Sequence, residues 1–356
     1  MIAVFQACAL GFLRDRAGMV MTLLLPPLVY LLFAAVFGAG ARGEIDPSIA
    51  LHDSAATSAS HAVEAGLRAR PGSRLTVLAD VNAVESAVVE GRADAGLILR
   101  PGVSASPEAE ILSAAGREVA AAGLEGQLRG LGAETAHSSG NGAFRSLSIR
   151  TVGPQGDLQS VYYAGAVSIM FVFFAAMHGA MAGLDDRRSG LQARLALVAG
   201  GLAPILAGRA AWLVAVGLAQ SLAILAAAAS RLSQTAPWQI VAWAITALLA
   251  SVAAAGVALA VISLCRSRDQ AQPLSTFIVL MLAAVGGSMA PRFLMPDLIR
   301  QLGWFTPHAW AIEAYQTLLW RGVLDATVLA AWVILGAVGV VAGLIALLVE
   351  VRRAPA

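Results

Sequence analysis

The chain has 356 residues, of which 58% are hydrophobic and 13% are charged, whereas soluble domains carry about 25% charged residues. This composition, with its long apolar runs, indicates an integral membrane protein, and a net charge of +2 gives no support for nucleic-acid binding. All 24 basic residues are arginine, which excludes a Walker-type phosphate-binding loop because that loop requires a lysine.

Six segments are long and apolar enough to cross a hydrocarbon core of about 30 Å as helices. In chain order they cover residues 18–39, 160–183, 208–230, 238–264, 273–291 and 325–349. Residues 1–17 are expected to form an interfacial helix, or else to extend the first span. A cleaved signal peptide is the alternative for the first span, but the apolar region of a signal peptide runs for only about 7–15 residues.

The distribution of arginine orients these spans, because cytoplasmic connections carry an excess of positive charge. If the six helices alternate in direction, one side of the membrane holds Arg14, Arg16, Arg187, Arg188, Arg194, Arg209, Arg266, Arg268, Arg352 and Arg353. The short connections on the other side hold only Arg231, Arg292, Arg300 and Arg321. This bias predicts that both termini are cytoplasmic, with residues 350–356 as a cytoplasmic tail.

Residues 40–158 have a different character, with shorter apolar runs and more Gly, Ser, Asp and Glu. Strand-like and helix-like patterns alternate here, which predicts a small α/β domain on the extracytoplasmic side. His52, His61 and His137 lack ligand spacing, so no metal site is expected. The predicted fold is therefore an α-helical integral membrane protein with six transmembrane helices and an inserted extracytoplasmic α/β domain.

The predicted spans contain one ionisable residue in their interiors, His178. Ion-driven pumps and intramembrane proteases place charged or acidic residues within the membrane, and the metalloprotease signature H-E-x-x-H is absent from the sequence. We expect His178 to be packed or to form a hydrogen bond between helices. We therefore predict that the chain is not an enzyme and holds no cofactor or metal. If it transports a substrate uphill, the energy must come from a separate ATPase.

Four consecutive charges, Asp185 to Arg188, follow the second span and begin a cytoplasmic connection over residues 184–209. Residues 184–199, "LDDRRSGLQARLALVA", suit a helix with acids in its first turn and Arg194 further along, which is favourable for the helix dipole. Such a helix is a candidate docking element for a cytoplasmic partner. The alternative is that these charges only stop translocation and set the topology.

The strings "DDRRSGLQARLAL" and "LAGR" resemble the cytoplasmic motif of the ABC type-2 exporter permeases, in the subgroup with a large outer domain between spans one and two. The departures from the family pattern are Gln192 for a glutamate, Ala199 for a proline and Arg209 for a lysine. The resemblance assigns coupling to the ATPase to Asp185, Asp186, Arg187, Arg188, Gly190, Leu191, Arg194 and Arg209.

Residues 286–322, "GGSMAPRFLMPDLIRQLGWFTPHAWAIEAYQTLLWRG", are similar to the outer loop of the same family, and the domain segment "VVEGRADAGLILRPGVS" is also similar. The resemblance implies short re-entrant helices that dip into the outer leaflet and act as an outer gate, whereas an ordinary periplasmic loop is the alternative. The matching gate residues are Gly286, Gly287, Met289, Pro291, Met295, Pro296, Pro307 and Trp310.

Together these features predict the transmembrane permease subunit of an ATP-binding-cassette exporter in the bacterial inner membrane, with a five-span domain over residues 160–349. The resemblance implies that ATP and Mg²⁺ are bound by a separate cytoplasmic subunit, and that a second permease copy or a paralogue completes the pathway. Membrane lipid is an expected contact, a periplasmic adaptor is compatible with this class, and the substrate is left open. The first alternative is a membrane-anchored sensor with an extracytoplasmic receptor domain, and the second is a membrane enzyme.

Overall fold

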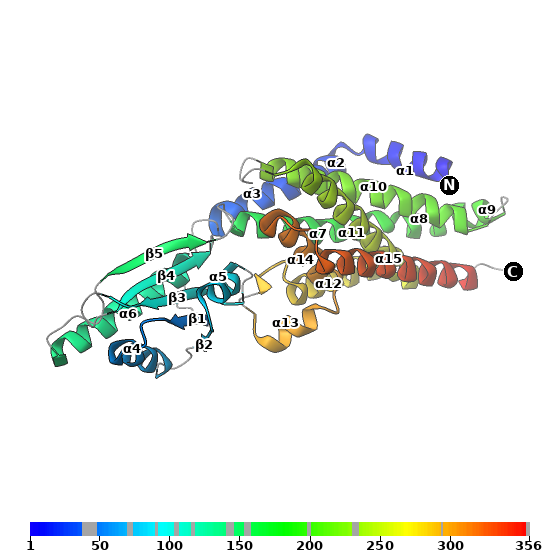
Figure 1. Cartoon of the computed structure of the whole chain (residues 1–356). Helices are drawn as coiled ribbons and strands as arrows, with labels where there is room; N and C mark the ends of the chain where they lie inside the picture. Colours follow the sequence, from blue (N-terminus) through cyan, green and yellow to red (C-terminus); the bar gives the residue numbers. More distant parts are fainter. Residues whose placement is uncertain are drawn as a thin grey trace. The chain divides into compact units, whose positions relative to one another are not determined.

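The computed structural model describes residues 1–37, 48–69, 74–89, 92–102, 107–114, 118–139, 146–152, 158–197, 201–229, 235–292 and 295–353. The chain divides into two compact units, shown in Figure 1. One unit combines Met1–Val36 with Gln159–Ala356, and the other comprises Phe37–Leu158.

The first unit is helical. Its N-terminal part holds α1 (Ile2–Arg14), α2 (Arg16–Leu23) and α3 (Leu25–Phe37). The remaining helices are α7 (Leu158–Ala180), α8 (Ala182–Arg188), α9 (Leu191–Ala196), α10 (Ala203–Ala228), α11 (Pro237–Leu264), α12 (Arg268–Gly286), α13 (Asp297–Gly303), α14 (Pro307–Gln316), the π-helix Thr317–Arg321 and α15 (Ala326–Arg353).

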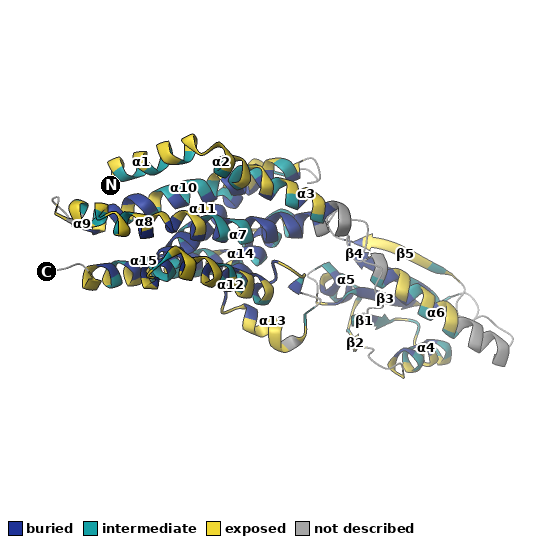
Figure 2. Ribbon diagram, turned by 180° about the vertical axis from the view of Figure 1, so that it is seen from behind, coloured by how far each residue is buried: buried dark blue, intermediate teal, exposed yellow. Residues whose placement is uncertain are grey.

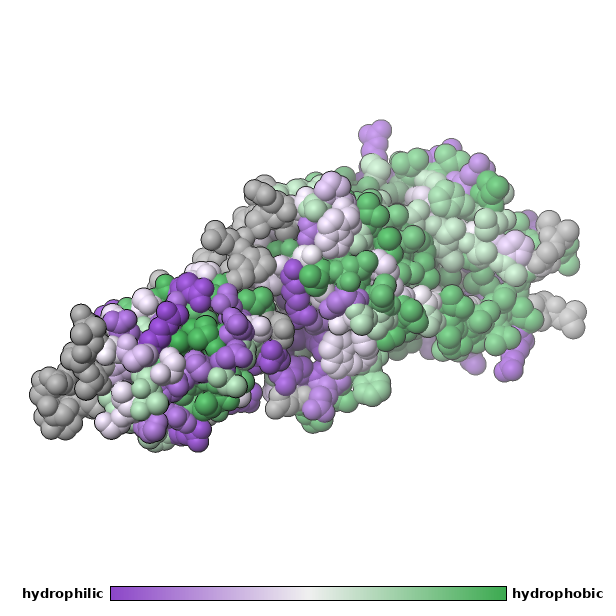
Figure 3. All heavy atoms as spheres, in the orientation of Figure 1, coloured by the Kyte–Doolittle hydropathy of each residue, from purple (hydrophilic) through white to green (hydrophobic). Residues whose placement is uncertain are grey.

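Within the described residues, five helical segments are long and apolar enough to span a membrane: Arg16–Ala34, Ser160–Arg188, Ala203–Ala228, Pro237–Leu264 and Ala326–Arg353. The segment predicted as a span at 273–291 corresponds to α12, which falls outside this set. Arg268, Asp269 and Gln270 occupy the first turn of α12, which has 19 residues in all, so its apolar part is short. Large apolar side chains such as Val333 are strongly exposed, and Figure 3 shows a mainly hydrophobic surface over these helices. These features define a mostly helical membrane protein.

The N-terminal residues form a separate helix rather than an extension of the first span. Helix α1 ends at Arg14, and Asp15 then caps α2 by accepting a 2.9 Å hydrogen bond from the backbone N–H of Gly18. Helix α1 lies against α10, where the rings of Phe5 and Phe12 each approach Trp212 with centroids 5.5 Å apart. Aromatic contacts thus hold α1 on the helical unit.

Helices α11 and α15 pack together through glycine. A Cβ atom on Gly256 would overlap the backbone of Gly339, and a Cβ atom on Gly339 would lie 2.6 Å from the carbonyl oxygen of Val252. Small residues let two helix backbones approach closely, which is how apolar helices associate where lipid removes the hydrophobic driving force.

The second unit contains a five-stranded sheet in the order β2-β1-β3-β4-β5. Strand β1 is parallel to β2 and β3, β3 is antiparallel to β4, and β4 is parallel to β5. The elements are β1 (Ser48–Asp53), α4 (Ser58–Arg68), β2 (Arg74–Val77), α5 (Val81–Val89), β3 (Ala95–Arg100), β4 (Glu108–Ala114), α6 (Glu118–Ser139) and β5 (Leu147–Val152).

The two faces of the sheet bury alternate residues, as the two-residue period of a strand requires. Leu51, Leu97 and Ile111 belong to the core that includes residues of α4 and α6, whereas Ile98 and Leu112 belong to the core under α5. Figure 2 shows β3 buried and β5 exposed along most of its length. The unit therefore has its own two-layered core.

Candidate functional site

The charged connection after α7 forms two short helices instead of the single helix predicted over 184–199. Helix α8 ends at Arg188, and Gly190 adopts a φ of 70° before α9 begins at Leu191. This left-handed conformation is readily adopted by glycine and ends helices. The single-helix prediction is therefore wrong, because the left-handed glycine in the motif separates α8 from α9.

The first three charges of the motif each contact a different helix. Asp185 accepts hydrogen bonds from Nε of Arg268 at 2.8 and 3.0 Å, which ties α8 to the start of α12. Asp186 pairs with Arg209 of α10, and Arg187 pairs with Glu350 of α15. Because successive helical residues point about 100° apart, consecutive charges must face different neighbours. We call these six residues the charged hub.

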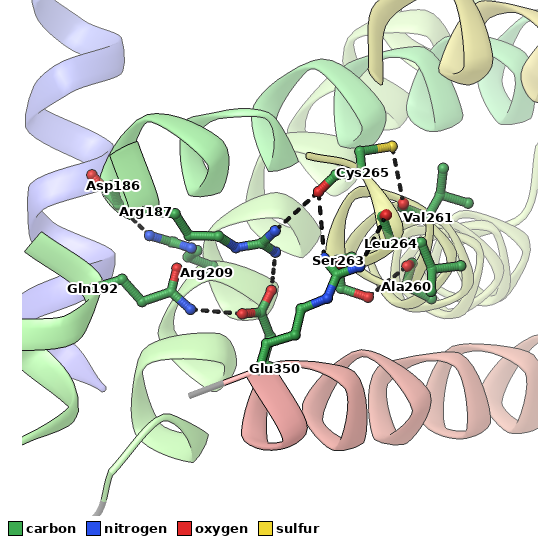
Figure 4. A network of polar contacts seen from close by, with 11 residues as sticks. Asp186, Arg187, Gln192, Arg209, Ala260, Val261, Ser263, Leu264, Cys265 and Glu350 are labelled. Atoms are coloured by element: carbon green, nitrogen blue, oxygen red, sulfur yellow. Dashed lines mark hydrogen bonds and ion pairs between the residues drawn. The ribbon is translucent and has the colours of Figure 1, made fainter. Parts of the chain in front are cut away.

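Of the two hub members without a predicted site role, Arg268 and Glu350, the more deeply buried is Glu350. Its side chain is only 6% exposed, in the last turn of α15, and it also accepts a 2.7 Å hydrogen bond from Nε2 of Gln192. Figure 4 shows Arg187 and Gln192 converging on this carboxylate from α8 and α9. A buried carboxylate requires such partners because an unpaired buried charge is strongly destabilising. The signal in the sequence that could have identified Glu350 was a single acidic residue at the end of an apolar helix.

The C-terminal end of α11 also contacts the charged hub, through Arg187. Nη1 of Arg187 donates to the carbonyl oxygen of Cys265 at 3.2 Å. Arg353 donates to the carbonyl oxygens of Ser263 and, at 3.2 Å, Leu264 (Figure 4). The last carbonyl groups of a helix have no intrahelical donors, so these two arginines satisfy them. The ends of α8, α10, α11, α12 and α15 are therefore joined by polar contacts.

The other predicted coupling residues face outwards. Arg188 and Arg194 are exposed, and the Leu191 side chain is 40% exposed. Within the hub, the pair of Asp185 and Arg268 is the exposed one, and its hydrogen bonds raise the pKa of Arg268 above the ordinary value. Of the eight predicted residues, four are therefore in ion pairs of the hub, three are exposed outside it, and Gly190 forms the break between α8 and α9.

The predicted outer loop folds back on the helical unit through short helices. Helix α12 ends at Gly286 and is capped by Gly287, which has a φ of 103°. The hydroxyl of Tyr162 on α7 donates to the Gly287 carbonyl oxygen at 2.5 Å. The same hydroxyl accepts a 3.2 Å hydrogen bond from the backbone N–H of Arg292. Helix α14 is capped by Thr306, whose Oγ1 accepts from the N–H of Ala309. One tyrosine thus fixes the turn that follows α12.

Arg292, another residue without a predicted site role, is buried in this loop. Its guanidinium lies 3.9 Å from the centre of the Trp304 ring, and Nη1 lies 3.7 Å from Oε2 of Glu313. Nη2 donates to the carbonyl oxygen of Arg300 at 3.3 Å. Burial lowers the pKa of Arg292, and the charge of Glu313 opposes that shift. The arginine contributes a buried charge around which the loop packs.

The predicted gate residues occupy structural positions in this loop. A Cβ atom on Gly286 would collide with Thr306 and His308, and Trp310 donates from Nε1 to the Trp304 carbonyl oxygen at 2.7 Å. Pro296 and Pro307 stand at helix starts, where a missing N–H costs little. Met289 is 49% exposed, whereas Pro291 and Met295 are half-buried.

His178 does not behave as the sequence analysis expected. It is exposed on α7 rather than packed between helices, and it lines a groove formed with α2, α3, α10 and α12. The expectation of a packed histidine is wrong for the chain by itself, because the neighbouring helices leave this face of α7 uncovered.

The helical fold and the charged hub define a multi-pass membrane protein whose helix ends are joined on one side. Comparison with protein families gives a match to the ABC-2 family transporter proteins over residues 16–348, nearly the whole chain. The chain belongs to this family, and is a permease that associates with an ATP-binding subunit. A search of curated proteins finds no match.

Proposed function

We propose that this permease is an exporter that moves substrate from the cytoplasm or the inner leaflet outwards, powered by a separate cytoplasmic ATPase. The proposal places both termini in the cytoplasm of a bacterial cell, with α12 as a sixth span and the sheet unit outside the inner membrane. ATP and Mg²⁺ would be bound by the partner, and this chain would perform no bond chemistry. A second copy or a paralogue would complete the pathway.

The observation that carries the proposal is the charged hub. Asp185, Asp186 and Arg187 lie next to each other on α8, yet they bind α12, α10 and α15 respectively. A displacement of α8 and α9 would therefore act on several membrane helices at once. This is the connection that a permease needs if a partner in the cytoplasm supplies the mechanical work.

Helix α12 extends this connection towards the outer loop. It begins at Arg268, which binds Asp185, and it is capped by Gly287, whose carbonyl oxygen binds Tyr162. A 19-residue helix is about 28 Å long, close to the thickness of the hydrocarbon core. A movement at the hub would thus reach the outer loop through one rigid element, which supports an outer gate at 286–322.

The outward-facing residues suggest how the partner docks. Arg188 and Arg194 are exposed cations, and Leu191 adds an exposed apolar side chain between them. A complementary partner surface would be acidic at its rim and apolar at its centre. The competing sensor function has no comparable support, because five apolar spans exceed what an anchor needs.

Co-purification of the ATPase with the full-length permease tests this proposal. We expect the double substitution Arg188→Glu and Arg194→Glu to abolish co-purification and export, because both change the sign of exposed docking charges. Arg129→Glu is the matched control, since Arg129 is an exposed arginine of the sheet unit. Normal co-purification and normal export by the double variant would contradict the docking assignment.

A further inference from the structure

A groove of about 430 Å³ lies among α2, α3, α7, α10 and α12. This volume falls within the roughly 300–1,000 Å³ typical of sites for small molecules. Its apolar wall includes Met21, Phe171, Phe174, Met177 and Met181. Thioether and aromatic side chains form adaptable surfaces for apolar ligands, so the groove suits the apolar body of a small molecule.

The groove lies near the hub end of the helices. Met181 precedes Asp185 by four residues, and Gln272 follows Arg268 by one turn. Among the described residues that line it there is no Asp, Glu or Arg. Since charged ligands are normally met by opposite charges, this lining favours an uncharged ligand.

Gln220 of α10 provides the chemical signal. Its side chain is 1% exposed and lines the groove, and its Nε2 donates to the carbonyl oxygen of Thr22 at 2.6 Å. That carbonyl group is free to accept because Pro26, four residues later, has no N–H to donate within the helix. A carbonyl oxygen can only accept, so the amide orientation of Gln220 is fixed.

This fixed orientation leaves the other amide atom of Gln220 as an acceptor. Its Oε1 is buried and has no hydrogen-bond partner among the described residues. Ser275 of α12 also lines the groove and is 3% exposed. Its Oγ is likewise buried and has no hydrogen-bond partner among the described residues. Most buried polar atoms in proteins have a hydrogen-bond partner. Two unsatisfied oxygen atoms on residues of one groove therefore favour a ligand that supplies hydrogen-bond donors.

Gln239 of α11 shows what a fully satisfied buried glutamine looks like in this protein. Its Nε2 donates to the Leu318 carbonyl oxygen at 2.7 Å, and its Oε1 accepts from the N–H of Ala236 at 2.6 Å. Gln239 does not line the groove. A buried glutamine in these helices can therefore have both amide atoms satisfied, although Gln192 Oε1, beside the charged hub, also has no partner among the described residues.

We propose that Gln220 is a specificity-determining residue of a ligand site in this groove. The ligand is an uncharged amphiphile, with an apolar or aromatic body and at least one N–H or O–H donor for Gln220 Oε1, which Ser275 assists. This inference rests on the proposed export function, because it names the class of substrate that the groove would receive from the inner leaflet.

Two related dyes test the proposal: N-phenyl-1-naphthylamine, which carries one N–H, and its N-methyl derivative, which carries none. Their saturable binding to the full-length permease in lipid nanodiscs is measured by equilibrium dialysis, with empty nanodiscs as the background. We expect Gln220→Met to reduce the preference for the N–H dye roughly fivefold to tenfold, which corresponds to one hydrogen bond. Ser275→Ala, a milder change, should reduce it about twofold to threefold.

Because the preference is a ratio of two affinities of one sample, partial misfolding does not imitate the expected result. Gln239→Met is the matched control and should keep the preference of the unchanged protein. The proposal is overturned if both Gln220→Met and Ser275→Ala keep that preference, if no saturable binding exceeds the background, or if binding occurs only to monomers because a second copy fills the groove. ATPase co-purification is scored separately, so a normal complex without dye preference refutes this inference alone.

Discussion

The charged hub and the outer loop lie near opposite ends of α12, and they are stabilised by different physical means. The hub is held by three carboxylate–arginine pairs, which involve three consecutive residues of α8. The outer loop also contains a buried ion pair, Arg292 with Glu313, but its turn after α12 is held by close approach at Gly286 and Gly287 and by the single hydroxyl of Tyr162. The difference teaches that side-chain charges can join the ends of several helices at one place, whereas a tight turn depends on close backbone contact.

The largest effect is expected from Glu350→Ala in the hub. The substitution leaves Arg187, whose side chain is only 23% exposed, without its carboxylate, and breaking a buried pair typically costs about 3–5 kcal/mol. We expect a large drop in the thermal unfolding temperature of the purified permease. The exchange Arg187→Glu with Glu350→Arg should recover part of the loss, and an unchanged melting curve for Glu350→Ala would show that the pair is not structural.

The next effect concerns the outer loop, where Gly287→Ala should destabilise the protein by about 1–3 kcal/mol. Gly287 has a φ of 103°, and its Cβ would lie 2.9 Å from the Tyr162 hydroxyl oxygen. Gly343→Ala is the control, because a Cβ at that helical position meets nothing within 4 Å. Thermal unfolding of both variants checks the contrast, and equal stabilities would mean that the turn tolerates a side chain.

A smaller effect is expected from Tyr162→Phe, which removes only the hydroxyl that joins Gly287 to Arg292. The lost hydrogen bonds should reduce the free energy of unfolding by about 1–2 kcal/mol. In a double variant with Gly287→Ala the two losses should not add, because the residues share one contact. Strict additivity in the unfolding measurements would indicate that the hydroxyl does not fix this turn.

The smallest change in stability is expected from Asp185→Asn. Its ion pair with Arg268 is about half exposed on both sides, and exposed pairs contribute about 0–1 kcal/mol. Export should nevertheless fall, because this pair links α8 to α12, the helix that leads to the outer loop. Vesicle transport and unfolding measured on the same preparation separate these effects, and normal transport would remove α12 from the proposed coupling route.

The sequence predicted the parts of the site that depend on local pattern. Asp185 to Arg188 follow an apolar span, and that position together with the resemblance to the family motif marked them as candidates before any contact was known. Two predictions were wrong: a single helix over residues 184–199, and a packed His178. The break at Gly190 depends on a single backbone angle, and the exposure of His178 depends on which helices cover α7.

The sequence by itself determined that this is an arginine-only, low-charge membrane protein with a charged connection after its second span, because hydropathy and charge are additive properties of the chain. Only the tertiary structure revealed the contacts of Glu350, Arg292 and Gln220, and two of these residues, Glu350 and Gln220, lie far along the chain from the residues they bind. Glu350 is 163 residues from Arg187, and Gln220 is 198 residues from Thr22. Burial and hydrogen-bond partners depend on contacts between segments that are distant in sequence. Helix packing therefore decides whether an isolated polar residue has a partner in the protein, is exposed, or can bind a ligand.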